Sequence, residues 1–387
     1  MNLKLFTSES VSEGHPDKVC DQIADAILDA TLALDPKAHV AAEVFATKEF
    51  VLIGGEITAK ATPNYEQIAR KVLREIGYVD PLLGIGADTC TVEVRVNTQS
   101  PDIAQGVDRG DLLAQGAGDQ GIMFGYATNE SSGFMPLPIG IAHKLVRTAS
   151  TLRKHGDFPH ARPDMKSQVT IDYTDSQHPR IHTVLMSVQH DPDIDLDAFK
   201  AFIHDNIMVP VARSFGLNED FEYLINPTGS FVIGGPWGDT GLTGRKLIVD
   251  TYGGSSRHGG GAFSGKDPSK VDRSASYYAR YIAKNIVAAG LADRAEIQLS
   301  YAIGVAKPLS INLETFGTAH VAEERILDAI DIVFDARPGA IIQQFDLTHP
   351  RFRYRDTSIY GCFGRPDLAL PWEKLDKVQA LRNYLEL

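Results

Sequence analysis

Residues 253–270 read GGSSRHGGGAFSGKDPSK and combine six glycines in thirteen residues with three cationic side chains. Glycine can adopt positive φ and lets the backbone approach a ligand closely. Successive exposed N–H groups in such a loop can form a concave anion site. Because Arg257, Lys266 and Lys270 add positive charge, the segment predicts a polyphosphate-binding loop.

A helix is predicted directly after this loop. Asp267 and Pro268 are typical of an N-cap and a first helical turn. Apolar and aromatic residues then recur at helical spacing from Val271 to Ile286, and Gly290 ends the pattern. Bound phosphates would therefore lie at a helix N-terminus, where the helix dipole favours negative charge.

Two other interpretations of the loop stay open at this point. Residues 260–266 match the G-x-x-x-x-G-K part of a P-loop, but Asp267 stands where a P-loop needs Ser or Thr to hold magnesium. The second alternative is a mobile surface linker. Linkers of that kind are rich in Gly and Ser and lack interleaved Arg and Lys.

Composition limits the class of protein. The 387 residues carry a formal net charge of −12, which argues against nucleic acid as a partner. Residues 245–284 differ, since eight Lys and Arg stand there against three Asp, a local excess of positive charge that suits a small anionic substrate. The three cysteines lack disulfide or zinc spacing. With no secretory signal and no apolar run of about 18 residues, we expect a cytoplasmic protein with no membrane partner.

The order helix–strand–strand–helix is predicted three times along the chain. The predicted ranges are 16–34, 40–46, 50–57 and 64–76, then 138–154, 167–173, 181–189 and 195–214, then 268–289, 295–304, 308–315 and 321–334. We therefore predict an α+β fold of three related units, each a small sheet with helices on one face. The polar segment 97–121 falls outside this order, and a loop of this length is usually either disordered or a functional lid. The glycine-rich segment 226–246, which ends in two cations, also falls outside it.

The N-terminal segment SEGHPDK, residues 12–18, is a second candidate site. Pro16 keeps His15 extended and fits the first turn of a helix. A phosphate could use His15 and Lys18, and magnesium could use Asp17.

Acidic residues continue along the same predicted helix. Asp21, Asp25 and Asp29 follow Asp17 at intervals of four residues, so all four share one helix face. For these three acids we expect a solvated face rather than a site.

Five further residues are weaker candidates. Glu43 and Glu56 lie in predicted strands, Asp119 and Asp239 stand beside glycines, and Phe231 follows the Gly229-Ser230 turn and could stack on a base. Each also has a structural alternative, as a solvent-side Glu, a turn-forming Asp or a core Phe. The chain has no G-x-S-x-G or H-E-x-x-H motif, so no covalent nucleophile or zinc site is predicted.

Three motifs together resemble the S-adenosylmethionine synthetase (methionine adenosyltransferase) family of the bacterial type. They are GHPDK at 14–18, GAGDQG at 116–121 and GGGAFSGKD at 259–267. The resemblance runs from Phe6 to the PWEK segment at 371–374, which is nearly the whole chain.

The resemblance implies three related α+β domains about a pseudo-threefold axis, with boundaries at 1–101, 115–232 and 233–387 and a gating loop at 99–109. It implies a homodimer with shared active sites, or a dimer of dimers. The implied reaction joins ATP and L-methionine by attack of sulfur on the ribose C5′, releases triphosphate and hydrolyses it to pyrophosphate and phosphate. Two Mg²⁺ ions and one K⁺ ion per site are implied as cofactors.

The resemblance also implies roles for individual residues. The implied catalytic residues, which bind the triphosphate, are His15, Lys166, Arg245, Lys246 and Lys266. The other implied ATP contacts are Asp164, Ser230, Phe231, Asp239 and Ala262. The implied methionine contacts are Glu56, Gln99, Asp119, Asp239 and Lys270. The implied metal ligands are Asp17 and Asp272 for Mg²⁺ and Glu43 for K⁺.

Two positions depart from the family pattern. Met165 stands where a small residue is usual, and Cys362 replaces a common His. Neither is an implied charged ligand. The rival functions are a P-loop-like kinase or ATPase, which would form ADP, and a non-catalytic nucleotide-binding regulator, which would not need the His15 and Asp17 site.

Overall fold

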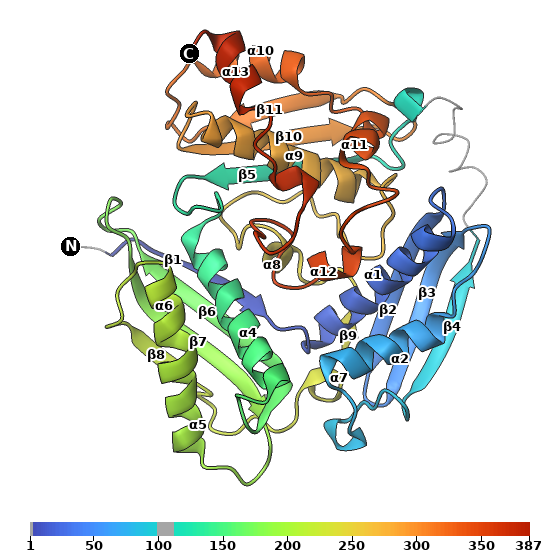
Figure 1. The fold of residues 1–387 in the computed structure, drawn as a ribbon, viewed down its shortest axis with the longest axis vertical. Coiled ribbons are helices and arrows are strands. Elements are labelled where there is room, and N and C mark those ends of the chain that lie inside the picture. Colours follow the sequence, from blue (N-terminus) through green and yellow to red (C-terminus); the bar gives the residue numbers. More distant parts are fainter. Residues whose placement is uncertain (1–2, 99–111) are drawn as a thin grey trace.

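The computed structural model describes residues 3–98 and 112–387. It has three lobes about a common centre (Figure 1), and each lobe is built on a helix, a β-hairpin and further helical structure. In chain order these elements are α1 (Pro16–Leu34), β2 (His39–Thr47), β3 (Phe50–Thr58) and α2 (Tyr65–Ile76); α4 (Leu137–His155), β6 (Ala161–Asp172), β7 (Arg180–His190), α5 (Leu196–Ile203) and α6 (Val209–Ser214); and α9 (Val271–Ala288), β10 (Arg294–Tyr301), β11 (Ser310–Glu314) and α10 (Glu323–Val333). The predicted α+β fold of three related units is confirmed.

Each lobe donates one strand to another lobe. β1 (Leu5–Val11), which precedes α1, pairs antiparallel with β6, and β5 (Gly121–Thr128), which precedes α4, pairs antiparallel with β10. β9 (Gly241–Leu242), which precedes α9, pairs antiparallel with β2. The exchange is cyclic: the strand that precedes each repeat's first helix extends the sheet of the next repeat, and the strand of the third repeat extends the sheet of the first. This arrangement agrees with pseudo-threefold symmetry.

The opposite edges of the sheets are less regular. β4 (Thr91–Asn97) adds parallel to β3, and β8 (Glu222–Ile225) adds parallel to β7. The resulting sheets have the orders β4-β3-β2-β9, β1-β6-β7-β8 and β11-β10-β5. In the third lobe α10 is followed by a helix, α11 (Pro338–Phe345), where the other two lobes continue into a parallel strand.

The remaining described elements are short. They are η1 (Pro81–Leu83), η2 (Leu112–Ala114), α7 (Gly235–Gly238), α8 (Leu247–Asp250), α12 (Tyr354–Thr357), η4 (Pro371–Glu373) and α13 (Val378–Leu385). No helix in the described ranges is both long and apolar enough to cross a membrane.

Two helices depart from their predicted ranges. The helix predicted over 195–214 is interrupted by a π-helical turn, η3 (His204–Met208), because Pro210 has no N–H to continue the α-helical hydrogen bonds. The helix predicted from Pro268 begins instead at Val271. Asp267 does not cap it, since its carboxylate accepts from Ser269 N at 2.9 Å and Val40 N at 2.7 Å.

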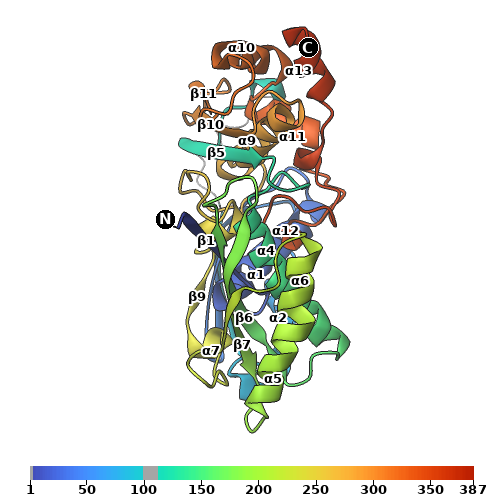
Figure 2. The ribbon, with the colours of Figure 1, turned by 90° about the vertical axis from the view of Figure 1, so that its left-hand side faces the viewer.

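Each sheet is covered by helices on one face only. Along β2, Val40, Ala42 and Val44 are buried, whereas Glu43 between them is exposed. In the second lobe, α4, α5 and α6 share one apolar core with β6 and β7, and Figure 2 shows α5 and α6 to one side of those strands. In the first two lobes the opposite face carries exposed side chains, whereas in the third lobe the glycine-rich loop covers part of that face, since Ser256 Oγ and Arg257 N donate to the buried Glu296 of β10.

The acidic face of α1 is buried, so the predicted solvated face is wrong. Asp21 and Asp25 have no exposed surface. Each acid accepts hydrogen bonds from the backbone of a segment that crosses α1, and the donors for Asp17, Asp21, Asp25 and Asp29 are Leu242 N (3.0 Å), Gly244 N (2.9 Å), Gly265 N (2.8 Å) and Tyr354 N (2.8 Å). These acids hold loops of the third repeat against the first.

Candidate active site

The N-terminus of α1 carries a buried histidine beside a carboxylate. His15 is 3% exposed and is the N-cap of α1, where its Nδ1 accepts from Asp17 N at 3.1 Å. Burial and the nearby Lys246 charge lower the pKa of His15 to about 3, although Asp17 opposes this shift. The ring is therefore neutral, and because Nδ1 accepts, the proton is on Nε2. His15 is thus a neutral hydrogen-bond donor.

Asp17 joins this helix end to the cationic segment after β9. Its carboxylate lies 2.6 Å from Lys246 Nζ and 3.8 Å from Arg245 Nε, and accepts from Leu242 N. Burial alone would raise the pKa of Asp17, but the Lys246 ammonium and the Leu242 N–H hold it below its usual value. Asp17 stays ionised and keeps both cations close to His15.

The second lobe contributes Asp164 and Lys166, both near the start of β6. The Lys166 side chain is exposed, and its charge also lowers the pKa of His15. Asp164 is buried and accepts from Gly235 N at 2.8 Å. Burial raises the pKa of Asp164 to about 6, and the neighbouring Asp239 adds to this shift.

The segment that leads to Asp239 is fixed against the end of β7. Phe231 N donates to His190 Nε2 at 3.0 Å, and His190 N donates to Phe231 O at 3.0 Å. Phe231 is half-buried, and Ser230 beside it is exposed. His190 was not among the sequence candidates, because its partner is 41 residues away and no local pattern marks it.

The glycine-rich loop lies along the edge of β2. Gly265 O accepts from Ala42 N at 2.9 Å, and Lys266 forms a β-bridge with Ala41. Gly265 has φ +79°, and a Cβ there would lie 2.0 Å from the Ala42 carbonyl oxygen. Only glycine fits this position, which fixes the direction in which Lys266 leaves the loop.

Two ion pairs lie where the loop ends and α9 begins. Lys266 Nζ lies 2.6 Å from Asp272 Oδ2, and Lys270 Nζ lies 2.6 Å from Asp267 Oδ2. Ala262, further back in the loop, lies against Gly244, where an added Cβ would be 2.6 Å from the Ala262 Cβ. The loop therefore approaches the Arg245–Lys246 segment directly.

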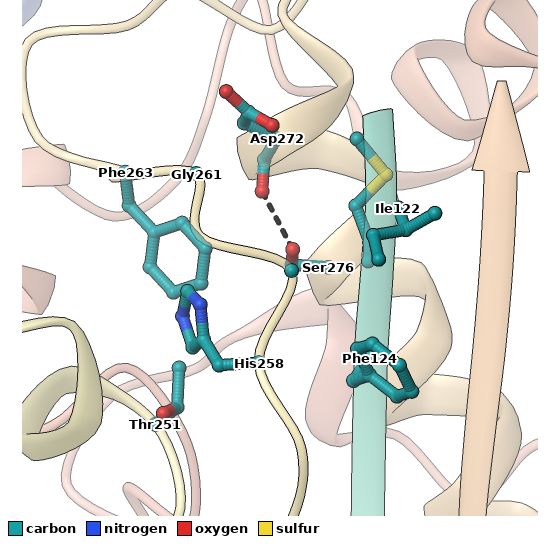
Figure 3. Close-up of a pocket in the computed structure, with 10 residues that line it drawn as sticks. Ile122, Phe124, Thr251, His258, Gly261, Phe263, Asp272 and Ser276 are labelled. Atoms are coloured by element: carbon teal, nitrogen blue, oxygen red, sulfur yellow. Dashed lines mark hydrogen bonds between the residues drawn. The ribbon is translucent and has the colours of Figure 1, made fainter. Parts of the chain in front are cut away.

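A small cavity lies between the loop and β5 (Figure 3). His258, Phe263, Asp272 and Ser276 are among its lining residues, and about 10 Å³ of free volume gives room for one water molecule. Ser276 Oγ donates to the Asp272 backbone oxygen at 2.6 Å. Asp272 thus borders the cavity, while its carboxylate is paired with Lys266.

The remaining acidic candidates lie on uncovered surface. Glu43 and Glu56 are exposed on the same open face of the first sheet, and Asp119 is exposed near Ser269, whose carbonyl accepts from Gly118 N. Partial desolvation raises the pKa of Glu43, with Asp21 and Glu56 adding to the shift and Lys266 opposing it. Gln99 and the predicted gating loop 99–109 lie outside the described residues.

Lys18 does not face the site, which corrects its prediction as a phosphate ligand. It is fully buried, and its Nζ lies 2.8 Å from Asp21 Oδ2 and also contacts Asp250 Oδ1. The two family departures are buried as well. Met165 lies in the core of the second lobe, and Cys362 Sγ donates to Thr357 O at 3.1 Å.

The metal candidates are single carboxylates rather than a preformed cage. Over residues 3–98 and 112–387, no group of three or more His, Cys, Asp or Glu is placed to hold a metal ion. Asp17 and Asp272 are each paired with one lysine. This donor set fits Mg²⁺ bound through one carboxylate and substrate phosphates, which is the usual mode for nucleotide-bound Mg²⁺.

Family models match the chain along almost its whole length. They are the N-terminal, central and C-terminal domains of S-adenosylmethionine synthetase, which match residues 3–101, 114–231 and 233–374. Among curated relatives, the S-adenosylmethionine synthase of Mesoplasma florum is 62% identical over 380 residues, covering 98% of this chain and 100% of the relative.

Two further relatives carry the same name. That of Mycoplasma mycoides is 61% identical over 381 residues, and that of Thermosynechococcus vestitus is 55% identical over 403 residues. Each alignment covers 98% of this chain and 97% of the relative. The resemblance inferred from the three motifs is confirmed, and the chain belongs to the S-adenosylmethionine synthetase family.

Proposed function

We propose that the chain is a methionine adenosyltransferase, which makes S-adenosylmethionine from ATP and L-methionine. The observation that carries this proposal is the meeting of His15, Asp17 and Lys246 at the start of α1. Family membership gives the reaction, and this cluster gives a place for a highly charged leaving group.

The reaction needs no general base for its first step. The methionine sulfur attacks the ribose C5′ and forms the S–C bond, and the C5′–O bond breaks so that triphosphate leaves with the electron pair. A thioether has no proton to lose, so catalysis depends on alignment and on stabilising the leaving group. Water then cleaves the triphosphate to pyrophosphate and phosphate.

The charged residues of the site suit the leaving group. His15 donates from Nε2 to the oxygen that leaves C5′, while Lys166, Arg245, Lys246 and Lys266 neutralise the triphosphate. In the free chain Lys246 and Lys266 are paired with Asp17 and Asp272. Before ATP arrives these two ion pairs hold the lysines in place. Substrate binding then exchanges the pairs for phosphate contacts.

Asp17 and Asp272 are the proposed ligands of two Mg²⁺ ions, and Glu43 is the proposed K⁺ ligand. Mg²⁺ supplies charge neutralisation on the phosphate oxygens. Asp17 suits this role because it is held ionised and is already fixed by Leu242 N. Glu43 lies on the open sheet face, close to Lys266 and Glu56.

For the nucleoside we propose Phe231 and Asp239, with Asp164, Ser230 and Ala262 lining the ATP site. For methionine we propose Glu56, Gln99, Asp119, Asp239 and Lys270. Exposure of Glu56 and Asp119 in the single chain supports a homodimer, or a dimer of dimers, in which a second subunit covers them. We also propose a cytoplasmic location without nucleic acid or membrane partners, in line with the net charge of −12.

The kinase or ATPase alternative has a specific difficulty. A P-loop needs a free Ser or Thr hydroxyl after its lysine, but Asp267 is buried and its carboxylate binds Val40 N, Ser269 N and Lys270 Nζ. Product analysis separates the two functions. With ATP, Mg²⁺ and methionine we expect S-adenosylmethionine, pyrophosphate and phosphate, whereas ADP as the main product, or ATP consumption indifferent to methionine, would refute the proposal.

A further inference from the structure

Lys18 connects two carboxylates that come from distant parts of the chain. It has no exposed surface, and its Nζ contacts Asp21 on α1 and Asp250 at the end of α8. A lysine Nζ that donates to two carboxylates in the interior is held as an ammonium ion. The lysine is therefore charged and serves as the counter-ion of both acids.

The same two acids hold the ends of the segment that contains Arg245 and Lys246. At one end, Asp21 Oδ1 accepts from Gly244 N at 2.9 Å. At the other end, Asp250 N donates to Lys246 O at 2.8 Å, within the turn that becomes α8. Residues 244–250 are thus attached at both ends to acids whose carboxylates share one buried ammonium group, and Cys362 N also donates to Asp250 O at 2.9 Å.

Loss of that ammonium would disturb the segment more than the helix. Asp21 is anchored on a 19-residue helix, whereas Asp250 belongs to a four-residue turn. Two buried carboxylates without a shared cation repel each other or take up protons. The weaker element would move, and Lys246 would lose its 2.6 Å contact with Asp17.

We propose that Lys18 is a positioning residue for Arg245 and Lys246, which it holds in place to receive the triphosphate without touching substrate itself. The inference rests on the proposed function, since it takes these two cations as triphosphate ligands. Small displacements of charged groups in a positioning site have large effects on rate and affinity.

A double-mutant cycle with inorganic tripolyphosphate as an inhibitor against ATP tests this role. Lys18→Met should weaken inhibition by about tenfold or more and leave the KM for methionine within about twofold. Adding Lys246→Met to Lys18→Met should weaken inhibition by less than about twofold further, since the first change already displaces Lys246. Independent effects that multiply in the double variant would overturn the proposal.

Lys284→Met is the matched control. Lys284 is also a largely buried lysine, paired with Glu373 at 2.6 Å, but it lies away from this segment. The fold-changes in tripolyphosphate inhibition caused by Lys284→Met and Lys246→Met should multiply in the double variant. Asp250→Asn is the second test variant, because it keeps the side-chain shape and the Lys18–Asp21 pair; it should reproduce the non-additivity with Lys246→Met.

The result also distinguishes this inference from the proposed function. If the wild-type protein forms no S-adenosylmethionine and does not bind tripolyphosphate, the proposed function fails. If the wild type is active and inhibited by tripolyphosphate, but Lys18→Met and Asp250→Asn are both additive with Lys246→Met, only the positioning role fails.

Discussion

Asp25 on α1 accepts two hydrogen bonds from the guanidinium of Arg273 on α9, at 2.6 and 2.8 Å. Both side chains are buried, with exposures of 0% and 1%. Asp25 also accepts from Gly265 N, so the pair joins the first helix, the glycine-rich loop and the third-lobe helix at one point. The loop's position thus depends on a buried ion pair between residues 248 positions apart.

We predict that Arg273→Met lowers the free energy of unfolding by about 3 kcal/mol or more, because it leaves the Asp25 carboxylate buried without its cation. Urea unfolding followed by circular dichroism measures the change. The control is Arg213→Met, which removes an exposed pair with Glu219 and should cost less than about 1 kcal/mol. Equal losses in the two variants would contradict the structural role of the Asp25–Arg273 pair.

His143 should make stability depend on pH in the acidic range. It is buried, with Nδ1 2.7 Å from Ser10 Oγ, and burial, helped by Arg365 and Lys18, lowers its pKa from 6.5 to about 3. The unfolded chain takes up a proton below pH 6.5 that the folded chain refuses, so this contribution to stability is complete above pH 6.5 and is lost as the pH falls toward 3.

The corresponding measurement compares unfolding at pH 7.5 and pH 5 in His143→Gln and wild type. Between these values, at about 1.4 kcal/mol per pKa unit, the wild type should lose about 2 kcal/mol that the variant does not lose. His178→Gln, at an exposed position, should behave like the wild type. An unchanged pH dependence in His143→Gln would refute the assignment.

Asp17→Asn tests the proposed Mg²⁺ ligand. The change keeps the side-chain shape and removes the charge that faces Lys246 and that would bind the proposed Mg²⁺. Since metal clamping of phosphates is worth several kcal/mol, kcat should fall by about a hundredfold or more, and saturation should require more Mg²⁺. Asp205→Asn, at an exposed acid, is the control. Near-normal activity and Mg²⁺ dependence in Asp17→Asn would exclude this role.

Subunit complementation tests the shared active site. Glu56 is exposed on an open sheet face, whereas His15 is buried at the start of α1. If the two act in one site across a subunit boundary, mixing inactive His15→Asn with inactive Glu56→Gln under exchange conditions should restore part of the activity. Each variant mixed with itself is the control. A fully active monomer in sedimentation at assay concentration would rule out the shared site.

Much of the fold follows from local sequence pattern. The alternation of Val40, Ala42 and Val44 with polar or small neighbours predicts β2, and the Pro16 and Asp17 pair predicts the start of α1. Local pattern does not indicate which sheet a strand joins. β1 precedes α1 in sequence but pairs with β6, more than 150 residues later, so the cyclic strand exchange could not be predicted.

The candidate site was likewise only partly predictable from the sequence. Three motifs identified the family, and the structure brings His15, Asp17 and Lys246 together. The burial of Asp21 was not predictable from helical spacing, because its partner Gly244 N is 223 residues away. A four-residue repeat of acids on a helix is the same in sequence whether the face meets solvent or backbone N–H groups.

The central claim is that the C5′–O bond of ATP breaks and all three phosphates leave together. ATP labelled with ¹⁸O in the oxygen between C5′ and the α-phosphorus tests it most directly, with products analysed by mass spectrometry in the presence of methionine and Mg²⁺. We predict unlabelled S-adenosylmethionine and all of the label in the pyrophosphate and phosphate. Label retained in a nucleoside product such as ADP would show that a phosphorus–oxygen bond breaks instead, and would contradict this account.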